Sequence, residues 1–264
     1  MRHRLSNAKP LKESFVIFDL SVLFPLLCAI ALGSYIQTIT GFAFGLVFIS
    51  CVTTLNTLDL ENATMISCLL ALINTVVALG RRERHSLKKQ VLIILLFALP
   101  FVYIGYKVLT FLDANHISLI KYILSTVIIL ASLLLLAPPK PGRDVSAAPV
   151  FAFFGSLAGL LGGLFATSGP PLIFQFYRQN LPVTQIRDSL LMIFAVLSTA
   201  RLIIGISLDG IQPIVWTTAL CGIPVTFIFT VLAKNYPPKM NDLTLRRLAA
   251  CLLILAACNI ALQA

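Results

Sequence analysis

Long apolar stretches constrain this sequence more than any other feature does. A helix needs about 20 consecutive apolar residues to cross a bilayer. Hydrophobic residues make up 58% of the 264 residues and charged ones only 11%, whereas about 25% are charged in a typical soluble domain. The sequence therefore predicts one all-α transmembrane domain of about eight helices in a lipid bilayer. The stretches lie near 15–55, 63–80, 91–112, 117–137, 149–177, 186–208, 213–233 and 243–263.

The distribution of charge and of cysteine argues against other classes of protein. The net charge is +10, but the basic residues gather at the ends of apolar stretches and form no patch interleaved with aromatics. We therefore predict no nucleic-acid partner. All 6 cysteines fall inside apolar stretches and none forms a Cys-x-x-Cys pair, so we expect free thiols and no metal or other cofactor.

The two halves of the chain look like copies of each other. Three matches in the same order, at an offset near 125 residues, predict a duplicated four-helix unit. Repeat 1 would cover about 15–137 and repeat 2 about 149–263, joined by a Pro-rich linker at 138–148. The matching pairs are Thr40-Gly41-Phe42 with Ser168-Gly169-Pro170, Leu55 to Thr75 with Leu181 to Arg201, and Pro100 with Pro224.

The first and fifth stretches are predicted to be interrupted helices. Each is too long for one ordinary span or carries a break, and helix breaks persist in membranes only where protein or a water-filled cavity satisfies the free backbone groups. The breaks therefore mark candidate solute-binding positions. These are Gln37, Thr38, Thr40 and Gly41 in the first break, and Thr167, Ser168, Gly169 and Pro170 in the second.

The second break has the pattern of a helix that restarts inside the membrane. Ser168 suits an N-cap and Pro170 suits a first turn, and Thr40-Gly41 offers a similar start in the first half. Because helix N-termini bind anions, two such restarts favour an anion site. In the alternative interpretation, the glycines only allow close helix packing and the hydroxyls bond back to their own helices.

Two polar residues inside apolar stretches complete the candidate site. Arg201 lies deep in the sixth stretch, where a charge is costly and usually functional, and its natural partner is an anion. Alternatively, Arg201 snorkels or pairs with Asp209. Asn74 occupies the equivalent region of the first half and is either a ligand or a hydrogen-bonding link between helices.

Other polar residues are expected to have anchoring roles. Tyr106, with Lys107 and Tyr103, is interpreted as part of an interfacial belt. The acidic residues lie in loops or near the ends of stretches, so no proton relay is predicted. Since no catalytic constellation lies at membrane depth, the chain is predicted not to be an enzyme.

Positive charges indicate the orientation. The basic run at 81–84, with Lys88 and Lys89, and the basic N-terminus are both predicted to be cytoplasmic. Four spans per half would then place a second group of basic residues outside the cell, although Lys and Arg in short loops usually lie on the cytoplasmic side. We expect parallel repeats, and the alternative is an inverted second half with an additional re-entrant crossing. The conflicting group is Lys234, Lys239, Arg246 and Arg247.

The breaks also carry two glycine-rich motifs. The first is Gln37-Thr38-Ile39-Thr40-Gly41-Phe42-Ala43-Phe44-Gly45-Leu46, and the second runs from Gly159 to Pro171, followed by Leu181-Pro182 and Arg187. In order and spacing they resemble the sulfite exporter TauE/SafE family of membrane permeases, over nearly the whole chain from about residue 20 to 262.

This resemblance implies seven or eight helices from a duplicated four-helix unit, a bacterial inner membrane, and transport of sulfite, sulfoacetate or other organosulfur anions, often outward. Thr167-Ser168 stands where a more glycine-rich turn is expected, a difference that bears on the substrate. The sequence thus predicts a secondary transporter for a small anion, which could form homo-oligomers. The alternative is a membrane receptor or assembly protein that transports nothing.

Overall fold

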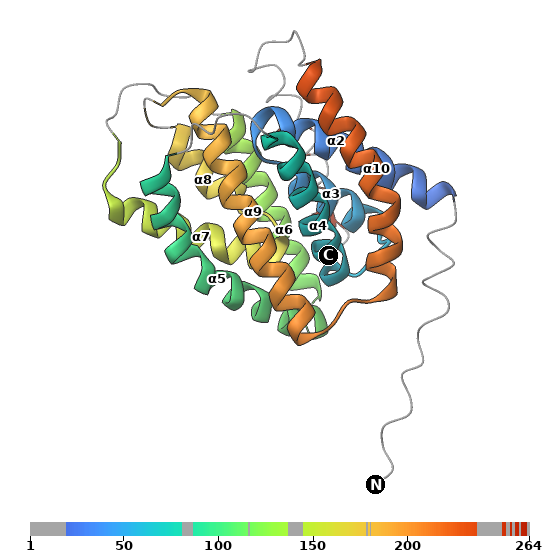
Figure 1. Cartoon of the computed structure of the whole chain (residues 1–264). Helices are drawn as coiled ribbons and strands as arrows, with labels where there is room; N and C mark the ends of the chain where they lie inside the picture. Colours follow the sequence, from blue (N-terminus) through green and yellow to red (C-terminus); the bar gives the residue numbers. More distant parts are fainter. Residues whose placement is uncertain are drawn as a thin grey trace.

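The computed structural model describes residues 20–80, 87–115, 117–136, 145–177, 179 and 181–236, with isolated positions between 250 and 262. Every extended regular element in these ranges is an α-helix, and the helices pack side by side (Figure 1). They are α2 (Leu20–Thr40), α3 (Phe44–Leu55), α4 (Leu60–Leu79), α5 (Lys88–Asn115), α6 (Ile117–Leu136), α7 (Ala148–Phe165), α8 (Gly169–Tyr177), α9 (Val183–Leu208) and α10 (Pro213–Asn235).

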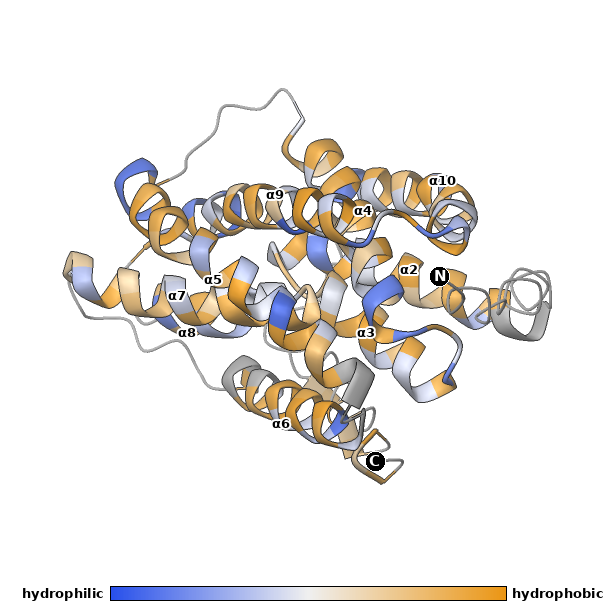
Figure 2. Cartoon of the chain, turned by 90° about the horizontal axis from the view of Figure 1, so that it is seen from below, coloured by the Kyte–Doolittle hydropathy of each residue, from blue (hydrophilic) through white to orange (hydrophobic). Residues whose placement is uncertain are grey.

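Six of the described helices are long and apolar enough to cross a membrane: α2, α4, α5, α7, α9 and α10. Hydrophobic residues occupy most of the length of these helices (Figure 2), and many large ones are exposed on the outside of the bundle, as lipid contact requires. Helix α3 and the described part of α6 are shorter apolar helices. The eighth predicted stretch lies mostly outside the described residues. So do most of the linker, the basic run at 81–84 and the N-terminal segment.

Both predicted helix interruptions are present. Residues 41–43 separate α2 from α3, and residues 166–168 separate α7 from α8. Helix α8 begins at Gly169, directly after Ser168, as the sequence predicted. Helix α3 begins only at Phe44, so the expected restart after Thr40-Gly41 was wrong in detail. The reason is local, because Gly41 and Ala43 both adopt positive φ angles (85° and 89°) that helical continuation excludes.

Helices α5 and α7 make a close contact through glycines on both helices. A Cβ atom on Gly159 would lie 2.1 Å from the carbonyl oxygen of Ala98, and one on Gly163 would lie 2.3 Å from that of Val102. The backbones can approach this closely only without side chains at these positions. For Gly159 and Gly163 the packing interpretation is therefore correct.

Helices α4 and α9 lie against each other in opposite directions. Thr64, near the start of α4, contacts Arg201 in the second half of α9. Glu61 and Asp209, at the start of α4 and just after α9, meet at one tyrosine of α5. Residue numbers therefore rise along α4 as they fall along α9, and both helices pack on α5.

Candidate functional site

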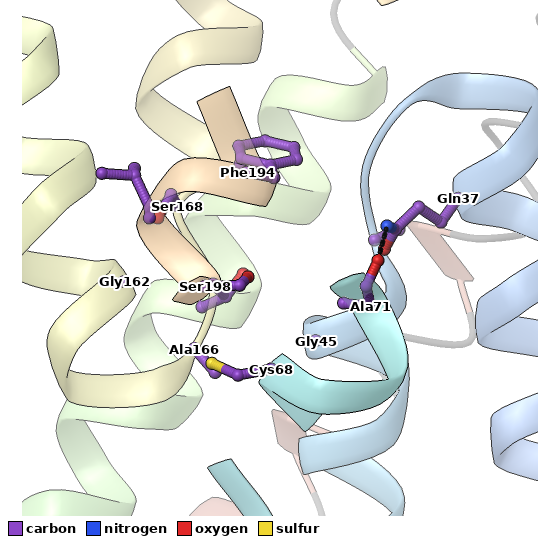
Figure 3. Close-up of a pocket in the computed structure, with 13 residues that line it drawn as sticks. Gln37, Gly45, Cys68, Ala71, Gly162, Ala166, Ser168, Phe194 and Ser198 are labelled. Atoms are coloured by element: carbon purple, nitrogen blue, oxygen red, sulfur yellow. Dashed lines mark hydrogen bonds between the residues drawn. The ribbon is translucent and has the colours of Figure 1, made fainter. Parts of the chain in front are cut away.

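A cavity of about 30 Å³ lies between the two helix breaks (Figure 3). Six helices contribute to its wall, either directly or through the break beside them, although the breaks are more than 120 residues apart in the sequence. The tertiary structure thus brings both interruptions to one place. The lining residues are Gln37, Ala43, Gly45, Cys68, Ala71, Gly162, Ala166, Thr167, Ser168, Gly169, Phe194, Leu197 and Ser198.

The N-terminal ends of two helices meet at this cavity. Ala43 and Gly45 belong to the start of α3, and Ser168 and Gly169 to the start of α8. The first N–H groups of a helix have no partner in that helix and carry the positive end of its dipole. Two such ends facing one polar cavity inside an apolar bundle favour an anionic occupant.

Four of the predicted site residues line the cavity: Gln37, Thr167, Ser168 and Gly169. The amide nitrogen of Gln37 donates to the carbonyl oxygen of Ala71 at 3.3 Å and to the hydroxyl of Thr75 at 3.2 Å. These bonds hold Gln37 against α4 at the wall of the cavity.

Asn74 lies apart from the lining and links three helices. Its amide nitrogen lies 2.9 Å from the Ser34 carbonyl oxygen, 2.9 Å from the Thr38 hydroxyl and 2.6 Å from the Thr230 hydroxyl, so its two hydrogens are shared among three acceptors. The Thr38 and Thr230 hydroxyls each donate their hydrogen to a carbonyl of their own helix. The side-chain group of Asn74 that faces them must therefore be its donor, the NH2 group. Thr38 and Asn74 therefore connect α2, α4 and α10, as the interpretation of Asn74 as a link between helices expected.

Replacing Asn74 with Leu should lower the melting temperature of the purified protein without removing stabilisation by a small anion bound at the cavity. The change removes the two donor hydrogens that two hydroxyls and one carbonyl share at a fully buried position, at roughly 0.6–2 kcal/mol for each bond in a membrane protein. Thermal unfolding in detergent, with and without a panel of small anions, measures both quantities. Thr199→Ala, at an exposed hydroxyl that bonds to its own helix, is the control. Loss of anion-dependent stabilisation in a stable Asn74 variant would instead make Asn74 a ligand.

The remaining residues of the two breaks have local roles. The Thr40 hydroxyl donates to the carbonyl of Ile36 and accepts from the N–H of Phe42, so it closes the end of α2 and does not cap α3. At Gly41, a Cβ atom would lie 3.1 Å from the carbonyl oxygen of Arg187. Pro170 is buried in the first turn of α8.

Arg201 is buried one helical turn beyond Ser198, a cavity residue. It is 1% exposed, which excludes snorkelling. One terminal nitrogen donates to the hydroxyl of Thr64, and the guanidinium lies 4.9 Å from the centre of the Tyr106 ring. Nε and Nη1 have no hydrogen-bond partner among the described residues. A buried cation with free donors is costly unless an anion joins it.

Sequence reasoning missed three residues near this site. Cys68 and Ser198 line the cavity, and Ser198 stands one turn before Arg201, a spacing that could have indicated it. Tyr106 was expected in an interfacial belt but is completely buried, because it faces α4 and α9 while Tyr103 and Lys107 face outward. Because Tyr103 and Lys107 are typical of a membrane interface, the sequence did not indicate that Tyr106 is buried.

Comparisons with known proteins agree with this arrangement. The sequence profile of the family described as Sulfite exporter TauE/SafE matches residues 26–260. A Cupriavidus necator protein described as "Probable sulfite/organosulfonate exporter TauE" is 34% identical over 236 residues, covering 88% of this chain and 92% of that protein. No solved structure matches this chain. The matched region includes both breaks and Arg201.

Proposed function

Because the chain belongs to the sulfite exporter TauE/SafE family, whose members are membrane transporters and not enzymes, we propose that the cavity between its helix breaks binds sulfite or a small organosulfonate during export. The chain is a multi-pass membrane protein with six clear spanning helices. The observation that carries the proposal is the meeting of two helix N-termini at one polar cavity beside a buried arginine.

The proposed ligands divide into two groups. At the breaks, Thr167, Ser168 and Gly169 surround the oxygens of the anion, and Gln37 lines the wall with its amide hydrogens bonded to α4. Arg201, one turn further along α9, supplies the compensating positive charge through nitrogens that have no partner among the described residues.

We also propose that the two halves are inverted copies, contrary to the parallel arrangement that loop charges favoured. The antiparallel packing of α4 and α9, which are equivalent in the repeat, supports inversion. In the repeat, α2 is equivalent to α7 and α5 to α10. Helix α5 of the first half packs on α7 of the second, and α10 of the second half packs on α2 of the first, which also supports inversion. Helix breaks in paired inverted repeats are typical of secondary transporters that bind substrate near the bilayer midplane. The proposed membrane is the bacterial inner membrane, with the N-terminus in the cytoplasm.

Flux in liposomes tests the proposed function. We expect saturable uptake of labelled sulfite in alkaline medium, where little sulfur dioxide crosses the lipid unaided, and competition by short organosulfonates but not by carboxylates. Ser168→Ala should raise the KM about tenfold, since a hydrogen bond to a charged group contributes roughly 1.5–3 kcal/mol. Ser156→Ala, at a hydroxyl that bonds to its own helix α7, should behave as wild type.

Two outcomes would contradict the proposal. Folded protein that moves none of these anions would favour the receptor or assembly alternative, particularly if it purified with a stable protein partner. Sulfite flux with an unchanged KM in Ser168→Ala would place the binding site away from the breaks.

A further inference from the structure

A tyrosine hydroxyl joins two carboxylates near one end of the α4–α9 pair. Tyr106 of α5 is fully buried. Its hydroxyl lies 2.9 Å from Oε1 of Glu61, in the first turn of α4, and in hydrogen-bond contact with Oδ2 of Asp209, the C-cap of α9. The three oxygens come from three helices that pack on one another.

The number of hydrogens in this group limits its charge state. A phenol has one hydrogen to donate, and an ionised carboxylate can only accept. Two full hydrogen bonds at the Tyr106 oxygen therefore require a second hydrogen, held by either Glu61 or Asp209. With that proton, one carboxyl group donates to the phenol oxygen and the phenol donates to the other carboxylate. Without it, the single phenol hydrogen is shared between two negatively charged oxygens, which weakens both hydrogen bonds.

The buried guanidinium of Arg201 is an independent reason to expect ion binding here. It lies over the Tyr106 ring at 4.9 Å, and its Nε and Nη1 atoms have no partner among the described residues. With Glu61 and Asp209 both ionised, the group carries one net negative charge. One added proton makes it neutral, which a low-dielectric environment favours.

The group is connected to the cavity through both helices. On α9, Ser198 lines the cavity, Arg201 follows three residues later and Asp209 ends the helix eight residues after that. On α4, Cys68 lines the cavity, and Thr64 and Glu61 precede it by four and seven residues. Spacings of three and four residues keep Glu61, Thr64 and Cys68 on one face of α4, and Ser198 and Arg201 on one face of α9. Polar groups therefore extend from the cavity to the end of the α4–α9 pair.

We infer that Glu61, Tyr106 and Asp209 form a proton-binding site, and that the protein moves a proton together with the anion bound near Arg201. The inference rests on the proposed function for the presence of that anion. Opposite charges at neighbouring sites favour each other, and such coupling is reciprocal, so anion binding promotes protonation. Release of the proton weakens the contact among α4, α5 and α9 and opens this end of the path.

The other titratable groups nearby do not replace this site. Cys68 of α4 faces the cavity, and Arg201 of α9 supplies fixed positive charge. Lys107, next to Tyr106 in the sequence, lies over the ring of Tyr103.

Infrared spectroscopy of the purified protein tests the proton site without any transported anion. At neutral pD, wild type should show the C=O stretch of a protonated, hydrogen-bonded carboxyl group, and the band should disappear at high pD. The double variant Glu61→Gln/Asp209→Asn, which keeps a donor and an acceptor at each position, should lack it. Absence of the band in folded wild type, or its persistence in the double variant, would overturn the inference.

Liposome measurements with isethionate test the coupling. Isethionate is a strong-acid sulfonate that carries no proton through lipid, so acidification of the lumen during its uptake reports protons moved by the protein. The double variant Glu61→Gln/Asp209→Asn, which removes both carboxyl groups and keeps the Tyr106 ring under Arg201, should lower acidification at least tenfold. It should retain exchange of labelled for unlabelled isethionate within about threefold.

The outcomes separate the two proposals. Isethionate uptake by wild type without acidification, or normal acidification by Glu61→Gln/Asp209→Asn, would overturn proton coupling and leave the exporter function standing. Absence of any sulfite or sulfonate flux would overturn the proposed function, and the infrared band would still decide whether the proton site exists.

Discussion

Replacing Arg201 with Met should reduce sulfite flux about 30-fold or more, since loss of one partner of a buried ion pair costs roughly 2–5 kcal/mol. The same change should leave the melting temperature of the empty protein close to that of wild type. Arg201 is 1% exposed, and two of its nitrogens lack partners among the described residues. An apolar side chain of similar length removes that unfavourable burial, but it also removes the positive charge that offsets Glu61 and Asp209.

Flux in liposomes and thermal unfolding in detergent, with and without sulfite, measure both effects. Lys107→Met is the matched control, because it removes a positive charge from an exposed position on α5; its flux should stay near wild type. Wild-type flux in Arg201→Met would remove Arg201 from the binding site. A strongly lowered melting temperature of the empty variant would assign it a structural role instead.

Replacing Gly45 with Val should abolish transport by pushing the two breaks apart and filling the cavity. A Cβ atom on Gly45 would lie 2.5 Å from the carbonyl oxygen of Ala166 and 3.5 Å from Oγ of Ser67. Both Gly45 and Ala166 line the cavity, and a backbone carbonyl cannot move aside as a flexible side chain can. Overpacking of this kind destabilises by about 1–3 kcal/mol, so the protein should still fold while sulfite flux falls below detection.

Gly33→Ala is the control for Gly45→Val. Its Cβ atom would lie 3.1 Å from the Phe44 ring, which can shift, and flux should remain within a fewfold of wild type. Sulfite-dependent stabilisation should disappear in Gly45→Val and persist in Gly33→Ala. Sulfite flux through Gly45→Val at a wild-type rate would show that the path avoids the space between the breaks.

Hydropathy and break-forming residues predicted much of the helical framework. The interruptions after Thr40 and before Gly169 were predicted because glycine, proline and hydroxyl residues concentrate there. The signals that start and end a helix lie within a few residues of each other in the sequence. The start of α3 was missed by a few residues, since the positive φ of Ala43 has no signature in its residue type.

The directions in which side chains point were harder to predict from the sequence. Tyr103, Tyr106 and Lys107 share one turn of α5, yet Tyr106 is buried and Tyr103 is 49% exposed. The identity of the residues does not reveal which face of an apolar helix meets protein, because lipid and protein interiors are both apolar. Glu61 and Asp209 lie at helix ends, as the sequence predicted. That Glu61 and Asp209 converge on one hydroxyl depends on the packing of α4, α5 and α9.

The sequence by itself determined that the chain lies in a membrane, where its helices break, and which family it belongs to, because these properties depend on local composition and motif order. Only the tertiary structure decided that the two breaks enclose one cavity, that Asn74 links helices apart from it, and that Arg201 is buried over Tyr106. Each of these depends on the direction in which packed helices turn their side chains, and contacts between residues far apart in the sequence fix that direction.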